Sequence, residues 1–226
     1  MAVRIALLNA LIPLLAAVGA YLIAIAQGYP ERCVPLLEGC TSISAAARYS
    51  DGIFWFRGLM MPLSVLLAIY WVIQVRWLNL YSSKQLQLKF ILGLGIISAL
   101  ALILYVNFLG SHGSVYRFMR SFGVTFYFGF GMLAQLLSIH LLYQARALLP
   151  SPTRSLLSWQ LLCVGAQWTI GLISLGFTLT QPAFKHQADN IVEWNFALGM
   201  IAFYGINALI WEREKFKIKI LTLNQT

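Results

Sequence analysis

The chain has 226 residues, of which 60% are hydrophobic and 10% charged, with a formal net charge of +9 at pH 7. Soluble globular domains have roughly a quarter of their residues charged. The low charged fraction of this chain and its mean hydropathy of +0.76 together exclude that class. We attribute the positive charge to membrane topology and to anionic lipid, and we expect no nucleic-acid partner.

Six apolar stretches follow one another along the chain. A helix needs about 20 apolar residues to cross a membrane core that is roughly 30 Å thick. Because backbone polar groups in lipid must be satisfied internally, helices are favoured over an open sheet. The sequence therefore predicts an all-α fold, a single transmembrane domain of six helices over residues 1–226. The predicted spans are residues 5–27, 53–75, 90–109, 121–143, 156–180 and 191–211.

The first of these stretches is too long for the apolar part of a signal peptide, and we expect it to be a retained helix. The distribution of Lys and Arg then predicts the orientation. With the N-terminus inside, ten of the 16 cations lie on the cytoplasmic side and six on the opposite side. Both termini are therefore predicted to be cytoplasmic, and residues 28–52 form an extracytoplasmic loop.

This loop contains Cys33 and Cys40, whereas Cys163 lies inside the fifth span. On the oxidising side of the membrane the pair is expected to form a disulfide, which is favoured over a metal site or free thiols. Two thiols without a neighbouring histidine are too few ligands for a metal. We predict no metal and no cofactor, and we interpret Cys163 as a packing residue.

A stretch rich in hydroxyl groups and small side chains follows the cysteines, from Thr41 to Asp51. One interpretation is a short capped helix at the membrane interface. The other is a cradle for a lipid head group, in which Ser44, Arg48 and backbone amides bind phosphate.

Charged residues also gather at the extracytoplasmic ends of the spans, where burial in lipid is costly. Arg57 lies near the start of the second span, Arg117 and Arg120 just before the fourth, and Glu193 near the start of the sixth. The four are either a structural ion-pair cluster or a polar pocket for an anionic or zwitterionic head group. In the second case Asp51 and Asp189 are expected at the rim.

The sixth span carries a stripe of side chains at alternating spacings of four and three, which should face neighbouring helices. Its members are Glu193, Ala197, Met200, Tyr204, Asn207 and Trp211. Interhelical hydrogen bonds and a transport path both fit such a stripe.

Several of these segments together resemble the DRAM/FRAG family. They are the run from Thr41 to Ala46, Arg57, the segment from Arg117 to Arg120, and the Val192-Glu193-Trp194 sequence. The family includes damage-regulated autophagy modulators and Golgi proteins that remodel GPI-anchor lipids. The resemblance implies a six-helix membrane protein connected with lipid homeostasis, and the compact chain is similar to a bacterial relative. We therefore expect it in a bacterial inner membrane, with the first loop in the periplasm.

The favoured hypothesis is a protein that binds or remodels a membrane lipid at an outer-leaflet pocket. Arg57, Arg117 and Arg120 would bind the phosphate or carboxylate, and Glu193 would orient them or carry a proton as the catalytic group. If the protein is an enzyme, lipid acyl transfer or hydrolysis fits this context. The alternatives are a small-molecule or ion transporter or channel, and a non-catalytic structural partner of other membrane proteins.

Overall fold

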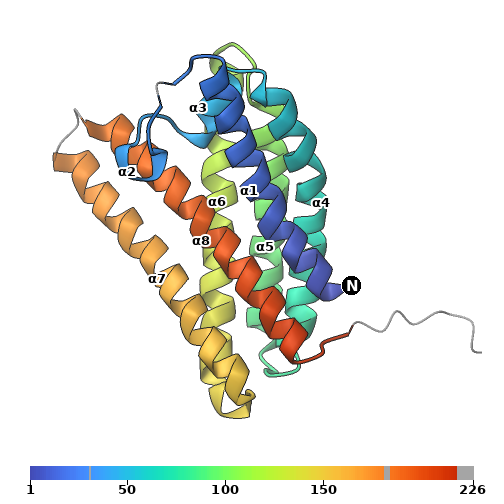
Figure 1. Cartoon of the computed structure of the whole chain (residues 1–226). Helices are drawn as coiled ribbons and strands as arrows, with labels where there is room; N and C mark the ends of the chain where they lie inside the picture. The colour runs from blue at the N-terminus through green and yellow to red at the C-terminus, as the bar shows by residue number, and fades with distance from the viewer. Residues whose placement is uncertain (31, 181–183, 218–226) are drawn as a thin grey trace, which may run out of the picture.

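The computed structural model describes residues 1–30, 32–180 and 184–217, and the regular structure within them is helical (Figure 1). Within these described ranges, six helices are long and apolar enough to cross a membrane, which confirms the predicted all-α transmembrane class. They are α1 (Ala2–Ala26), α4 (Gly52–Leu78), α5 (Gln85–Phe108), α6 (Ser114–Gln144), α7 (Ser151–Thr180) and α8 (Lys185–Arg213). Most extend beyond the predicted spans, so that Arg117 and Arg120 belong to the first turns of α6.

The six helices form a ring in which each packs against its neighbours. α1 contacts α4 and α8, α4 contacts α5, α5 pairs with α6, and α7 contacts α8 and, less extensively, α6. In Figure 1, α7 stands at one edge of the bundle. We call the end that carries α2 (Pro35–Glu38) and α3 (Ile43–Arg48) the loop end. The opposite end, where η1 (Arg146–Leu148) and the end of α8 lie, is the tail end.

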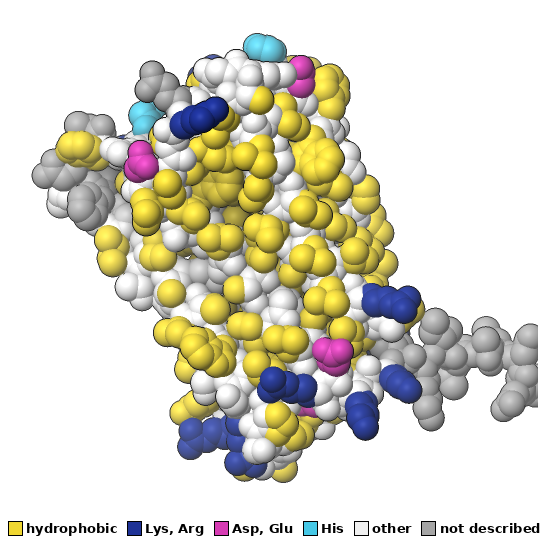
Figure 2. Space-filling view, in the orientation of Figure 1, with side chains coloured by type: hydrophobic (Ala, Val, Ile, Leu, Met, Phe, Trp, Pro, Cys, Tyr) yellow, Lys and Arg dark blue, Asp and Glu magenta, His cyan; other side chains and the backbone are white. Residues whose placement is uncertain are grey.

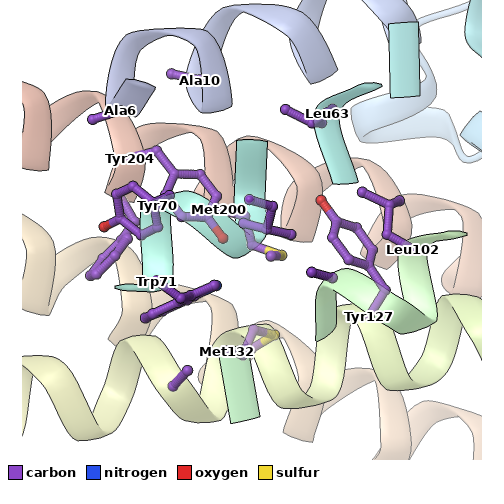
Figure 3. Close-up of a cluster of buried hydrophobic side chains, with 14 of the residues drawn as sticks. Ala6, Ala10, Leu63, Tyr70, Trp71, Leu102, Tyr127, Met132, Met200 and Tyr204 are labelled. Carbon is purple, nitrogen blue, oxygen red and sulfur yellow. The ribbon is translucent and has the colours of Figure 1, made fainter. Parts of the chain in front are cut away.

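The bundle interior combines large aromatic side chains with small ones. Trp71, Trp77 and Trp211 are fully buried, and α1 presents a face of buried alanines that includes Ala6 and Ala16. Figure 3 shows part of this core, where alanines of α1 lie near the aromatic side chains. Since apolar burial does not drive helices together within lipid, close packing of this kind must hold the ring.

The polar stripe of α8 faces its neighbours, as expected. Asn207 is fully buried and donates to the Tyr70 hydroxyl (2.9 Å) and to Gln74 Oε1 (2.6 Å), both on α4. Its own Oδ1 accepts from Gln160 of α7 (3.2 Å). Asn207 therefore joins three helices by hydrogen bonds, which favours a packing role over a position in a transport path.

A second polar junction closes the tail end. The Glu214 carboxylate accepts from Trp77 Nε1 (2.7 Å) and from the Thr153 hydroxyl (2.8 Å), so that α4, α7 and the end of α8 meet. Burial, and then the nearby Glu214 carboxylate, raise the pKa of Tyr81.

On the face shown in Figure 2, apolar side chains cover the middle of the molecule and most Lys and Arg side chains lie toward the tail end. This pattern suits a membrane-embedded belt.

Candidate functional site

The segment that contains α2 and α3 folds down onto the start of α8. The Cys33–Cys40 disulfide is confirmed, with the two Cα atoms 6.6 Å apart, and the Tyr21 hydroxyl donates to the Cys33 carbonyl (2.5 Å). Four side chains of α8 donate to carbonyls of the loop. They are Gln187 to Glu38 (2.6 Å), Asn190 to Gly39 (2.7 Å), Trp194 to Thr41 (3.0 Å) and Asn195 to Leu36 (3.1 Å). The loop is thus held by α8 as well as by its disulfide.

Glu193 lies at the centre of this contact. Its Oε1 accepts from both the backbone N–H and the hydroxyl of Ser44, each at 2.9 Å. The Ser42 hydroxyl accepts from Ala45 N (3.0 Å), so two side chains together cap the N-terminus of α3. Ser44 Oγ also lies 2.8 Å from the Tyr105 hydroxyl of α5. The hydroxyl-rich stretch therefore contains a capped short helix, whose Ser44 donors are directed to Glu193.

Arg57 has different partners from Glu193. Its guanidinium donates to the carbonyls of Val106 (3.2 Å), Asn107 (2.9 Å) and Leu109 at the end of α5. The last four carbonyls of a helix lack partners within that helix, and a cation is favourable there. Arg57 therefore satisfies the C-terminus of α5, and the sequence-based suggestion of an ion pair with Glu193 is not what the structure contains.

The two acidic residues expected at the rim lie elsewhere. Asp51 exchanges two hydrogen bonds with Gln27, accepting from Nε2 (2.6 Å) and donating its backbone N–H to Oε1 (3.0 Å). This pair joins the end of α1 to the start of α4. Asp189 is exposed on the first turns of α8.

Three of the predicted basic residues do meet. A hollow of about 470 Å³ opens at the loop end between α3 and the turn that joins α5 to α6. It is lined by Arg48, Tyr49, Gly110, Ser111, His112, Gly113, Arg117 and Arg120. None of the described residues that line it is acidic. We call this the basic hollow.

The basic hollow combines a partly fixed guanidinium group with the N-terminus of a helix. Arg48 donates to the Tyr49 hydroxyl (2.8 Å) and stacks on its ring at 4.3 Å, while its buried Nε has no hydrogen-bond partner among the described residues. The first turn of α6 contains no acidic side chain, and its N-cap, Gly113, provides no side-chain cap. Guanidinium groups and helix N-termini both bind phosphate readily in proteins.

Close packing of α5 and α6 sets the position of Arg120. At Gly123, one turn further along α6, an added Cβ would lie only 2.6 Å from the backbone nitrogen of Tyr105. The absence of a side chain at Gly123 thus allows the loop end of α6 to approach α5. This brings the basic hollow next to the Tyr105–Ser44–Glu193 chain of hydrogen bonds.

The sequence-based reasoning missed Tyr49 and His112 of the hollow, and also Tyr105. Tyr49 follows Arg48 directly, and His112 lies in a Gly-Ser-His-Gly turn between two spans, a segment typical of exposed polar loops. These two were detectable as neighbours of the basic residues. Tyr105 was not, because only the packing of α5 brings it to Ser44.

A family model described as the Frag1/DRAM/Sfk1/Cwh43P N-terminal domain matches residues 2–209. Comparisons with curated proteins and with solved structures gave no match. The matched region contains both Glu193 and the basic hollow. Since it covers almost the whole chain, this integral membrane protein belongs to the Frag1/DRAM/Sfk1/Cwh43P family, which confirms the resemblance indicated by its sequence motifs.

Proposed function

We propose that this protein binds the anionic head group of a membrane lipid in the basic hollow. The observation that carries the proposal is the gathering of Arg48, Arg117 and Arg120 around one cavity with no described acidic residue in its lining. Three like charges held together repel one another unless an anion joins them. A phosphate group offers several oxygens that accept hydrogen bonds from guanidinium groups in pairs.

The position of the hollow suits a lipid better than a soluble anion. Arg117 and Arg120 follow the start of α6 by three and six residues, which is about 4.5 and 9 Å along the helix. Phe118 and Phe122 are exposed on the same turns of α6. These exposed apolar side chains mark the level at which the surface of α6 becomes apolar, so a head group in the hollow would lie at the membrane interface with its acyl chains along the bundle. With the loop end extracytoplasmic, as the Lys and Arg distribution predicts, this lipid belongs to the outer leaflet.

The charge of the hollow also favours a class of head group. A zwitterionic lipid carries a cationic group next to its phosphate, and that group would lie among three arginines. An anionic lipid lacks this repulsion. Anionic lipids, especially those with a phosphate monoester, are therefore the expected ligands.

Native mass spectrometry from nanodiscs that contain equal amounts of anionic and zwitterionic lipid tests the proposal. The wild type should retain the anionic lipid, and Arg117→Gln/Arg120→Gln should reduce that retention at least tenfold, since two charged hydrogen-bonding partners are removed. The matched control is Arg32→Gln/Lys185→Gln, which removes two exposed charges on the same side of the membrane as the hollow. Equal losses in the two variants, or no preference in the wild type, would refute the proposal.

Remodelling of the bound lipid is the second half of the hypothesis, and the contact between Ser44 and Glu193 favours it. Ser44 and Arg48 are four residues apart on α3, and residues at this spacing share one face of a helix. The carboxylate therefore lies about one turn from the basic hollow. In this role Glu193 would take or give a proton while the arginines hold the head group.

A further inference from the structure

A small, partly open cavity lined by Glu193 lies within the ring of helices. Its volume is about 30 Å³, and its polar lining consists of Glu193 and three tyrosines, Tyr105, Tyr127 and Tyr204. The remaining lining is largely apolar, from Pro13 and Ala17 of α1 to Met200 of α8. Tyr127, Tyr204 and Met200 appear together in the core shown in Figure 3.

One of these polar groups, the Tyr204 hydroxyl, has no hydrogen bond of normal geometry to the described residues, although the Gln135 amide lies beside it. Tyr204 is only 2% exposed, and its hydroxyl makes no hydrogen bond within the described residues. Gln135 of α6 neighbours this hydroxyl, yet neither of its side-chain amide atoms has a partner there. A buried hydroxyl left without a partner costs about 1–3 kcal/mol, so a protein seldom keeps one.

The hydrogen bonds of Glu193 leave room for a further donor. Both bonds from Ser44 fall on Oε1. Because the single hydroxyl hydrogen of Ser44 goes to Glu193, the Tyr105 hydroxyl must be the donor in its bond to Ser44 Oγ. Ser44 and Tyr105 therefore have no hydroxyl hydrogen left for Oε2. The Ser42 hydroxyl also neighbours this carboxylate, but a carboxylate oxygen that accepts from Ser42 can still accept a second hydrogen bond from the cavity.

We propose that this cavity is a binding site for water, which hydrogen-bonds to Oε2 of Glu193 and to the Tyr204 hydroxyl. A cavity of roughly 10–15 Å³ by this measure accommodates one water molecule, provided that two or more polar groups hold it. The cavity meets both conditions. Such water solvates the carboxylate inside the bundle, where an isolated charge is expensive. It also gives Glu193 a partner for proton exchange within the protein, whether or not a lipid occupies the basic hollow.

The Tyr204→Phe variant tests the proposal by the sign of its effect. Loss of a hydroxyl that is satisfied by water should lower the Tm by about 2–4 °C, whereas loss of an unsatisfied hydroxyl should leave the Tm unchanged or raise it. Tyr116→Phe, at an exposed tyrosine of α6, is the matched control and should have no effect. An unchanged or raised Tm for Tyr204→Phe would overturn the proposal.

Solid-state NMR of the protein in lipid bilayers supplies the direct readout. Magnetisation should pass from water protons to the labelled Glu193 carboxyl and to the labelled Tyr204 ring carbon that bears the hydroxyl. In a direct hydrogen bond between Tyr204 and Gln135, the Tyr204 signal would receive no transfer from water. That result, or the absence of transfer at Glu193, would also overturn the proposal.

Discussion

Replacing Arg57 with alanine is expected to lower the free energy of unfolding by about 3 kcal/mol. The guanidinium donates to three carbonyls at the end of α5, two of them inside the helix. Alanine would leave these acceptors without donors near the membrane edge, and it would remove the favourable interaction of a cation with the helix C-terminus. Unfolding by SDS in mixed micelles, followed by tryptophan fluorescence, measures the loss.

The matched variant is Arg57→Lys. It keeps the positive charge but cannot reproduce the planar fork of donors, so it should recover only part of the lost stability. Lipid retention by the folded fraction of either variant should match that of the wild type, because Arg57 does not line the basic hollow. If Arg57→Ala unfolds like the wild type but loses its lipid, the assignment of Arg57 as a helix cap is wrong.

The Glu193→Ala variant is expected to show a similar loss of stability, roughly 3 kcal/mol. In the wild type, Oε1 of Glu193 accepts from both donors of Ser44, and this carboxylate lies amid the contacts that hold the loop on α8. Without this carboxylate the α3 N-terminus keeps only its Ser42 cap. Hydrogen exchange at α3 should rise more than exchange at α5 or α6, because the lost contacts are local to the loop.

The Glu193→Gln variant separates the structural role of this side chain from a chemical one. The amide oxygen of glutamine can accept from Ser44 as the carboxylate does, so we expect a loss of only about 1 kcal/mol. Glutamine cannot exchange a proton with substrate. If the protein remodels lipid, Glu193→Gln should stay folded and bind lipid but lose turnover. Turnover by this variant at the wild-type rate would exclude Glu193 as the proton carrier.

The outcome at Arg57 and Glu193 shows where reasoning from the sequence reaches its limit. Hydropathy predicted the six helices, because span length depends on local composition alone. The cost of a charge in lipid also indicated correctly that both side chains need partners. Their partners, however, are helix ends contributed by other parts of the chain, Val106 and Asn107 for Arg57 and Ser44 for Glu193. Such partners depend on helix packing, which span positions do not reveal.

The basic hollow was predictable in its parts but not as a whole. Sequence position alone places Arg48 in a loop cradle and Arg117 and Arg120 in a separate cluster, because Arg48 and Arg117 are 69 positions apart. The fold brings α3 beside the turn between α5 and α6, and so joins the two groups. Position alone favours Asp51 as a rim residue, yet Gln27 binds it at the end of α1.

The central claim is that Arg48, Arg117 and Arg120 bind the phosphate of an anionic lipid, and a structure in anionic-lipid nanodiscs tests it most directly. We expect phosphate density within hydrogen-bonding distance of at least two of these guanidinium groups, with acyl-chain density that continues from it along the apolar surface of the bundle. Arg117→Gln/Arg120→Gln should lack that density while keeping the same helices. Phosphate bound elsewhere, or the hollow closed by protein side chains in the wild type, would contradict the claim.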